Sequence, residues 1–437
     1  MQTVIIIGGG LAGLSAAAAL AEAGFRVRLF ESRGFLGGRA TSYPLSPSEE
    51  DSEVIDNCQH VLLGCCVNLL DFYGRLGVRD RIRFYRNFYF IEPGGRVSTL
   101  ARGFLPAPLH LAGSFLRLAC FSASDKLAIS RGILAILRER STRTDLASIS
   151  MLDWLREKRQ TQAAIDRFWR QILVSAINED LDRMAAMHGF QVFRLGFLAR
   201  ADSYEMGVPN VPLGELYGRG AWERTGNVTI SLRSPVESFD PEAGVCSGGA
   251  CHTADYYICA LPFERVHAAA PCLRVDARLF EHSPITGIHL WFHRAVTHLP
   301  HATLLDRNIQ WMFNKEGGRY VQVVVSASRS LTEMPRAEVI SLAVQELGEF
   351  IPAVREARLE RAHVVKELRA TFSAAPGTEA LRPGAETRFP NVFLAGDWTN
   401  SGWPATMEGA VRSGYIAAEA VARAAGRPAQ FLLPDLR

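Results

Sequence analysis

The sequence predicts an α/β protein in which both ends of the chain build one parallel sheet, with an α+β part interleaved between them. Near the amino terminus, the β-branched run Val4–Ile7 is followed at once by glycines and an Ala-rich segment. Near the other end, the apolar run 391–395 is followed by Gly-Asp and a second helical segment. Near-continuous apolar strands are typical of a parallel sheet covered on both faces. A chain of 437 residues also exceeds one ordinary core, which indicates roughly two or three packed units.

The glycines after the first strand fit the pattern G-x-G-x-x-G, in the run Gly8-Gly9-Gly10-Leu11-Ala12-Gly13. In this pattern the first glycine permits a tight turn and the second lets a pyrophosphate approach the backbone. The third lets helix and strand pack closely. The helix that follows presents free N–H groups and a partial positive charge to phosphates. The run therefore predicts a Rossmann-like dinucleotide site that uses Gly8, Gly10, Leu11, Ala12 and Gly13.

A second strand and an acid complete this unit. The predicted helix 14–23 stops at Gly24, and the strand 26–30 ends at Glu31. Glu31 lies 18 residues after Gly13 (31 − 13), close to the spacing of about 20 for the acid that binds ribose hydroxyls. A glutamate rather than an arginine favours an unphosphorylated adenosine ribose. We assign Glu31 and the adjacent Ser32 to the nucleotide site.

The carboxyl-terminal motif is a short strand that ends in Gly396-Asp397, followed by a predicted helix 405–425. Pro404 suits the first turn of that helix and Gly426 suits its end. Between the two motifs, further strands are expected at 227–230, 234–239 and 254–262. We therefore predict a discontinuous nucleotide-binding domain at 1–83, 213–275 and 385–437.

The rest of the chain is predicted to form a second domain from two segments. Residues 84–212 show mainly helical periodicity. Residues 276–384 contain strand candidates at 285–292 and 321–325 and a helix candidate at 338–350.

Composition excludes several classes of protein. Hydrophobic residues make up 48% and charged residues 21%, which is typical of a globular chain. The net charge of +3 (48 − 45) gives no case for nucleic acid. Eight cysteines without a C-x-x-C pair predict no metal site, and they are interpreted as free thiols in a reducing cytoplasm. The apolar run Val4–Ala21 has no preceding positive side chain and contains four glycines, which argues against a signal peptide.

The run Gly34-Phe35-Leu36-Gly37-Gly38-Arg39 resembles the G-G-R element of the flavin-containing amine oxidase and carotenoid desaturase superfamily. This resemblance implies that FAD is the cofactor and that Gly38 and Arg39 hold its pyrophosphate. It places Gly396 and Asp397 beside the ribityl and phosphate groups. It also implies that the start of the last helix faces the flavin through Ala405, Thr406 and Met407, and that the backbone of Val236 contacts the adenine.

Other runs resemble the hydroxysqualene dehydroxylases, also called squalene-associated FAD-dependent desaturases, of squalene and hopanoid biosynthesis. The resemblance extends over about residues 3–425, with one departure at Cys58, where the family usually has glycine. A Cβ at this position affects how closely the loop can approach the flavin. The matching runs are Asp56-Asn57-Cys58-Gln59-His60-Val61, Ala176-Ile177-Asn178-Glu179 with Trp169, Val211-Pro212-Leu213-Gly214-Glu215-Leu216-Tyr217, and Gly402-Trp403-Pro404-Ala405-Thr406-Met407-Glu408-Gly409.

The resemblance implies reductive removal of an allylic hydroxyl from a C30 isoprenoid, with a hydride from reduced flavin and loss of water. Because hydroxide leaves poorly, a positioned acid is needed. His60 is the first candidate and Glu408 the second, although a carboxylate at a helix start is more often a cap. Gln59 is expected to orient groups. An apolar tunnel that excludes water is also expected, with its mouth at 104–137.

Three alternatives stay open. A carotenoid-type desaturase would use the same flavin geometry to withdraw hydride. An amine oxidase would need an aromatic cage, and a scaffold that only binds flavin or lipid would show no turnover. An external electron donor is expected because no second G-x-G-x-x-G run has a strand and a helix around it.

The segment from Arg96 to Arg143 predicts contact with an anionic membrane surface. It holds eight basic and two acidic side chains, so it carries +6 (8 − 2) among interleaved apolar residues. Such a basic amphipathic segment can lie at lipid headgroups. The alternative is a solvated helix face over a core. We expect a cytoplasmic enzyme that associates peripherally with membranes.

Overall fold

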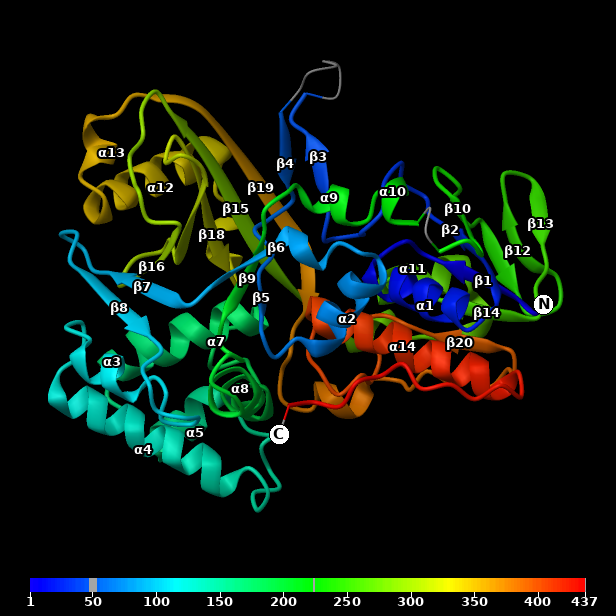
Figure 1. Ribbon diagram of the computed structural model, residues 1–437, viewed down its shortest axis with the longest axis horizontal. Coiled ribbons are helices and arrows are strands. Elements are labelled where there is room, and N and C mark those ends of the chain that lie inside the picture. The colour runs from blue at the N-terminus through cyan, green and yellow to red at the C-terminus, as the bar shows by residue number, and fades with distance from the viewer. Residues whose placement is uncertain (47–52, 223–224, 437) are drawn as a thin grey trace.

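The computed structural model describes residues 1–46, 53–222 and 225–436 (Figure 1). Its amino-terminal, central and carboxyl-terminal parts share one parallel sheet, in the order β10-β2-β1-β14-β20. This confirms the predicted α/β class and brings the two ends of the chain into one layer. The strands are β1 (Thr3–Ile7), β2 (Arg26–Phe30), β10 (Val228–Ser231), β14 (Tyr256–Cys259) and β20 (Val392–Leu394).

Two helices that are far apart in sequence pack together beside this sheet (Figure 1). They are α1 (Leu11–Glu22) and α14 (Met407–Ala424). Every residue of α1 from Leu11 to Ala21 is buried, as expected for a helix that is apolar on all sides. A Cβ at Gly414 would lie 2.2 Å from the backbone oxygen of Ala12, so only glycine permits this approach. The helix α2 (Val67–Arg75) packs on α14.

A seven-stranded sheet forms the core of the second part, in the order β19-β15-β18-β17-β16-β7-β8. Its pairings are antiparallel except that of β16 with β7. The segment 84–212, expected to be mainly helical, thus contributes two strands, because residues 87–91 pair with a strand more than 200 positions later. The strands are β7 (Asn87–Ile91), β8 (Val97–Ala101), β15 (His282–Phe292), β16 (His301–Leu304), β17 (Trp311–Glu316), β18 (Tyr320–Ser326) and β19 (Leu359–Phe372).

Short helices pack below this sheet around an aromatic core (Figure 1). Trp169 and Phe193 lie with ring centroids 4.7 Å apart, and Trp154 packs edge-on against Trp169. The helices here are α3 (Ala112–Arg117), α4 (Ala123–Glu139), α5 (Met151–Glu157), α6 (Gln162–Ala164), α7 (Arg170–Ile177) and α8 (Ala186–Gln191). Above the sheet lie α12 (Arg336–Phe350) and α13 (Ala353–Glu356), and the nucleotide part adds α9 (Leu213–Leu216), α10 (Arg219–Trp222) and α11 (Phe263–Ala269).

Small sheets join these layers: β3 (Ser42–Pro44) pairs with β4 (Val54–Asp56), and β9 (Met206–Pro209) lies between β5 (Leu62–Leu63) and β6 (Ile82–Tyr85). The carboxyl-terminal helix begins two residues later than predicted. The Thr406 hydroxyl accepts a hydrogen bond of 3.0 Å from the N–H of Gly409 and so caps the helix, which leaves Ala405 and Pro404 in the preceding loop. The strand predicted at 234–239 is limited to β11 (Ser238–Asp240).

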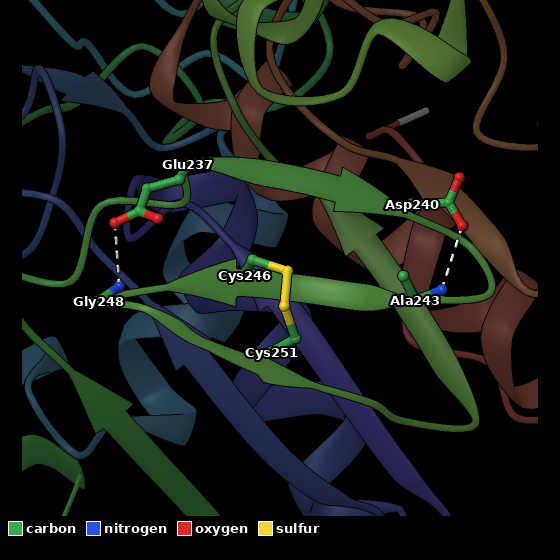
Figure 2. Close-up of a disulfide and its surroundings, with 6 residues drawn as sticks. All are labelled: Glu237, Asp240, Ala243, Cys246, Gly248 and Cys251. Atoms are coloured by element: carbon green, nitrogen blue, oxygen red, sulfur yellow. Dashed lines mark hydrogen bonds between the residues drawn. A yellow bond between two sulfur atoms is a disulfide. The ribbon is translucent and has the colours of Figure 1, made fainter.

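The expectation that all cysteines are free thiols is wrong for one pair. Cys246 on β12 (Gly244–Ser247) and Cys251 on β13 (Ala250–His252) form a disulfide across a hairpin (Figure 2). They are direct cross-strand partners, which brings the two side chains together. The other six cysteines are free. The sequence spacing did not reveal the pair because the hairpin register creates it.

Across the residues that the structure describes, no helix combines the length and the apolar character that crossing a bilayer requires.

The packing of α1 on β1 generates a test of the fold. A Cβ at Gly13 would lie 2.0 Å from the backbone oxygen of Gly8. Gly13→Ala should therefore lower the free energy of unfolding by about 3 kcal/mol, the upper range for overpacking. Gly74→Ala is the matched control, because Gly74 also lies in a helix and nothing stands within 4 Å of its Cβ position. Urea unfolding that shows equal stability for the two variants would contradict this packing.

Candidate functional site

Two glycine loops lie against each other at the carboxyl end of β1. Gly8 has a φ of +111°, and a Cβ there would lie 2.7 Å from the Ala260 oxygen, so this position requires glycine. The N–H of Gly37 donates to the Gly9 oxygen at 2.9 Å. A Cβ at Gly38 would come within 3.1 Å of the Gly10 Cα. The structure therefore brings the G-x-G-x-x-G and G-G-R loops together, as a shared pyrophosphate site requires.

The Glu31 carboxylate is buried beside these loops. One oxygen accepts the Gly9 N–H at 2.7 Å, and the other accepts the Arg33 N–H at 2.7 Å and the Ser32 hydroxyl at 3.1 Å. The backbone oxygen of Glu31 accepts the N–H of Ser234 at 2.8 Å. This contact places the turn before β11, which contains Val236, next to the end of β2. The predicted ribose and adenine residues therefore lie together.

The amino terminus of α1 fits the phosphates of a dinucleotide. Gly10 caps the helix without a side chain, and its first turn carries no acidic residue. Leu11, Ala12 and Gly13 are buried there. Because the first N–H groups of a helix have no partner within the helix, a buried and uncapped end favours an anion. The donor groups therefore suit the pyrophosphate of FAD.

An ion pair joins the two halves of the site. Arg39 Nη2 lies 2.6 Å from Asp397 Oδ2, and Arg39 Nη1 donates to the Ala370 oxygen at 2.8 Å. Burial acts to lower the pKa of Arg39, but the charge and hydrogen bond of Asp397, together with the charges of Glu264 and Glu367, outweigh burial, and the pKa is raised. Arg382, which sequence analysis did not identify, is buried and donates to the Asp397 backbone oxygen at 3.1 Å. Gly396 donates its N–H to Ser413 Oγ at 2.9 Å, which fixes the Gly-Asp turn against α14.

A cavity of about 250 Å³ lies between the seven-stranded sheet, the aromatic core and the start of α14. Its wall is mainly aliphatic and aromatic. Polar side chains come from the loop 58–60 and the turn 404–408, and others, such as Gln171, Ser175 and Thr303, lie elsewhere in the wall. The segment 104–137, which was expected at the tunnel mouth, contributes no residue to the lining of this cavity, whereas Leu100, four residues before it, does. Examples of the apolar lining are Leu63, Phe88, Phe90, Ile172, Leu195, Trp311, Phe313 and Trp403.

His60 lines the cavity. Its Nδ1–H donates to the Cys58 backbone oxygen at 2.9 Å, and its Nε2 forms no hydrogen bond with any residue that the structure describes. Burial lowers the pKa of His60 below its usual 6.5, and Lys315 and Arg39 act in the same direction. The protonated ring is therefore a stronger acid than the ring of an exposed histidine. Burial also raises the pKa of the neighbouring Cys58 to about 12, so this side chain stays a neutral thiol.

Gln59, which was expected to orient groups, forms two side-chain hydrogen bonds. Its Nε2 donates to the His60 backbone oxygen at 3.3 Å, and its Oε1 accepts a hydrogen bond of 2.9 Å from Lys315 Nζ. Lys315 also donates to Asp56 Oδ2 at 3.2 Å. Sequence analysis did not identify Lys315 because no motif surrounds it. The available signal was chemical: Lys315 is one of only four lysines and follows the apolar run Trp311–Phe313 in its strand.

Glu408 is 1% exposed and caps a helix other than its own. Its oxygens accept the N–H of Leu69 at 2.7 Å and both the N–H and Nδ2 of Asn68 at 3.2 and 2.9 Å. These groups form the first turn of α2. Burial raises the pKa of Glu408 to about 7, although the three donors act in the opposite direction. The geometry therefore favours the capping interpretation, while the cavity still contacts this residue.

The Glu31 contacts predict the effect of removing its carboxylate. Glu31→Ala takes away the acceptor of the Gly9 N–H and the expected ligand of the ribose. The purified wild type should be yellow and contain FAD rather than FMN, and the variant should retain less FAD. Flavin released by denaturation identifies the cofactor by chromatography. Glu237→Ala, which removes an exposed carboxylate in the nearby hairpin, is the control and should retain FAD fully. FMN in the wild type would contradict the assignment.

Comparison with known proteins gives one consistent result. The family model described as "Flavin containing amine oxidoreductase" matches residues 11–422 of this chain. A hydroxysqualene dehydroxylase from Rhodopseudomonas palustris is 29% identical and covers 98% of this chain and 99% of its own. A zeta-carotene desaturase from Zea mays is 26% identical over 94% of this chain and 82% of its own. An oxidoreductase from Methanosarcina mazei has the same fold, with a TM-score of 0.71 at 17% identity, over 94% of this chain and 99% of that one. The chain therefore belongs to the family of flavin containing amine oxidoreductases.

Proposed function

We propose that this FAD-dependent oxidoreductase removes the allylic hydroxyl of hydroxysqualene to give squalene. The observation that carries the proposal is the 29% identity to a hydroxysqualene dehydroxylase along nearly the whole of both chains. The Gln59-His60 pair and the run 402–409 support it, because both border one apolar cavity.

The reaction balances in a simple way. The C–O bond of the substrate breaks, the hydroxyl leaves as water with one added proton, and a C–H bond forms in its place. Reduced FAD, when bound, supplies the hydride. An external donor restores the electrons.

The residues of the chain account for the other requirements. An apolar wall binds an isoprenoid by burying its surface, and it keeps bulk water from the site where charge develops. His60 delivers the proton from Nε2, since Nδ1 is held by the Cys58 oxygen. Gln59 and Lys315 fix the loop that carries His60.

A second candidate is a carotenoid-type desaturase, which would oxidise an isoprenoid. It is favoured by relatives such as the zeta-carotene desaturase and a 15-cis-phytoene desaturase from Synechococcus elongatus, 24% identical over 97% of this chain and 98% of its own. An apolar cavity beside the flavin serves both reactions, so the direction of electron flow must be measured.

We expect squalene as the product when reduced enzyme is incubated with hydroxysqualene without oxygen. The cavity should admit the chain, and each reduced flavin should convert one substrate. Extraction and mass spectrometry identify the product. The absorbance of oxidised flavin should rise in proportion to the amount of squalene formed. The matched control reaction incubates oxidised enzyme with phytoene. If that reaction gives a desaturated product and the first reaction gives no squalene, the second candidate function replaces the proposed one.

His60→Ala should lower turnover by about 10²–10⁴, the usual contribution of a general acid, and leave FAD content unchanged. His293→Ala serves as the control, since His293 is not among the residues that line the cavity and its Nδ1 accepts the backbone N–H of Arg358 at 2.9 Å. Activity of the His60 variant within about threefold of wild type would place the acid elsewhere.

The pH dependence separates the two candidate acids. If His60 delivers the proton, single-turnover rates should fall as pH rises through an apparent pKa below 6.5, because the protonated form is lost there. That transition should disappear in His60→Ala. A transition near pH 7 that is kept in this variant and lost in Glu408→Gln would assign the acid to Glu408 instead.

A further inference from the structure

The segment from Arg102 to Arg140 has an unusual surface, with large apolar side chains turned to solvent. Phe104 is 97% exposed, at the tip of a loop that precedes α3. Leu116 at the end of α3 is 64% exposed, and Leu105 and Leu109 are also exposed. Isolated exposed apolar residues are ordinary, but a contiguous group in one segment marks an interaction site.

The outer face of α4 continues this surface. Its exposed residues Leu127, Arg131, Leu134 and Arg138 are spaced by four, three and four positions, so they form one stripe along the helix. The opposite stripe is buried in the aromatic core. A face that only contacts water would carry charged and polar residues, yet this one alternates leucine with arginine. Lys126 Nζ donates to the Leu116 backbone oxygen at 2.8 Å, which ties α4 to α3.

The two acidic side chains of the segment have partners, whereas its arginines form no ion pair within the described part of the chain. Its two acids are engaged: Asp125 is buried and caps α4 together with Ser122, and Glu139 binds Lys158 and the indole of Trp154. Five exposed arginines form no ion pair with any residue that the structure describes; they are Arg102, Arg117, Arg131, Arg138 and Arg140. The surface is therefore basic as well as apolar, and its charge is complementary to an anionic partner.

We propose that the loop 102–109, α3 and the outer stripe of α4 form a docking surface for an anionic lipid bilayer. Apolar side chains enter the interface while arginines bind headgroups, a combination that lipid satisfies and a purely polar partner does not. The surface adjoins the cavity, since Leu100 and Phe88 line its wall and Arg102 donates its N–H to Tyr204, which packs on Phe88. The proposal concerns binding and does not depend on the reaction proposed above.

Flotation of the FAD-loaded enzyme with vesicles tests the surface. Phosphatidylcholine vesicles are compared with vesicles that also contain phosphatidylglycerol, at low and high salt. Binding should require the anionic lipid and weaken at high salt, because ions screen the attraction. Arg131→Gln with Arg138→Gln should lower affinity by about thirtyfold, at roughly 1 kcal/mol for each basic residue. Phe104→Ser should lower it by about tenfold or more through lost apolar burial.

Matched controls lie elsewhere on the molecule. Arg265→Gln with Arg388→Gln removes two exposed arginines outside the surface, and Leu368→Ser removes a leucine that is 54% exposed. Both controls should bind as wild type does. Equal binding to the two vesicle types, or equal losses in test and control variants, would overturn the proposal. So would a concentration-dependent dimer in sedimentation that Phe104→Ser abolishes, because the surface would then join two copies of the chain.

Discussion

The close approach of α1 and α14 is the contact on which the rest of the site depends. Gly414 has no Cβ, and this lets the last helix lie directly on the backbone of the first. The same contact places Asp397 against Arg39 and sets the Thr406 end of α14 at the cavity. It also brings Glu408 to the first turn of α2. A nucleotide loop from one end of the chain and a cavity wall from the other therefore share a rigid frame.

A chain of hydrogen bonds joins Asp56, Lys315 and Gln59 to the backbone of His60 beside the cavity. Asp56 binds Lys315, Lys315 binds Gln59, and Gln59 binds the backbone of His60. Buried polar groups that are fully satisfied hold a site in one arrangement, whereas an unpaired group costs about 1–3 kcal/mol. These bonds fix the loop that carries His60 beside the mainly apolar wall of the cavity.

The sequence predicts strands and turns that local patterns encode better than it predicts contacts between segments that pair only in the folded chain. The strand at Arg26–Phe30 is found at the predicted residues, because glycine punctuation and apolar runs act within a few positions. Lys315 and its partner Asp56 are 259 positions apart, so no local pattern could join them. The strands at 87–101 and the Cys246–Cys251 bridge likewise depend on pairing register. The mouth of the apolar tunnel was expected at 104–137, but no residue of that segment lines the cavity.

The distance along the chain between Arg39 and Asp397 has a consequence for biosynthesis. These residues are 358 positions apart, so the ribosome completes the second half of the cofactor site long after the first. At about 5–20 residues per second, the delay is roughly 20–70 s. During that time the apolar surface of α1 has neither α14 nor β20 to cover it. The proposed cofactor site is complete only after both segments have been synthesised, and the uncovered surface of α1 makes the nascent amino-terminal half a substrate for chaperones.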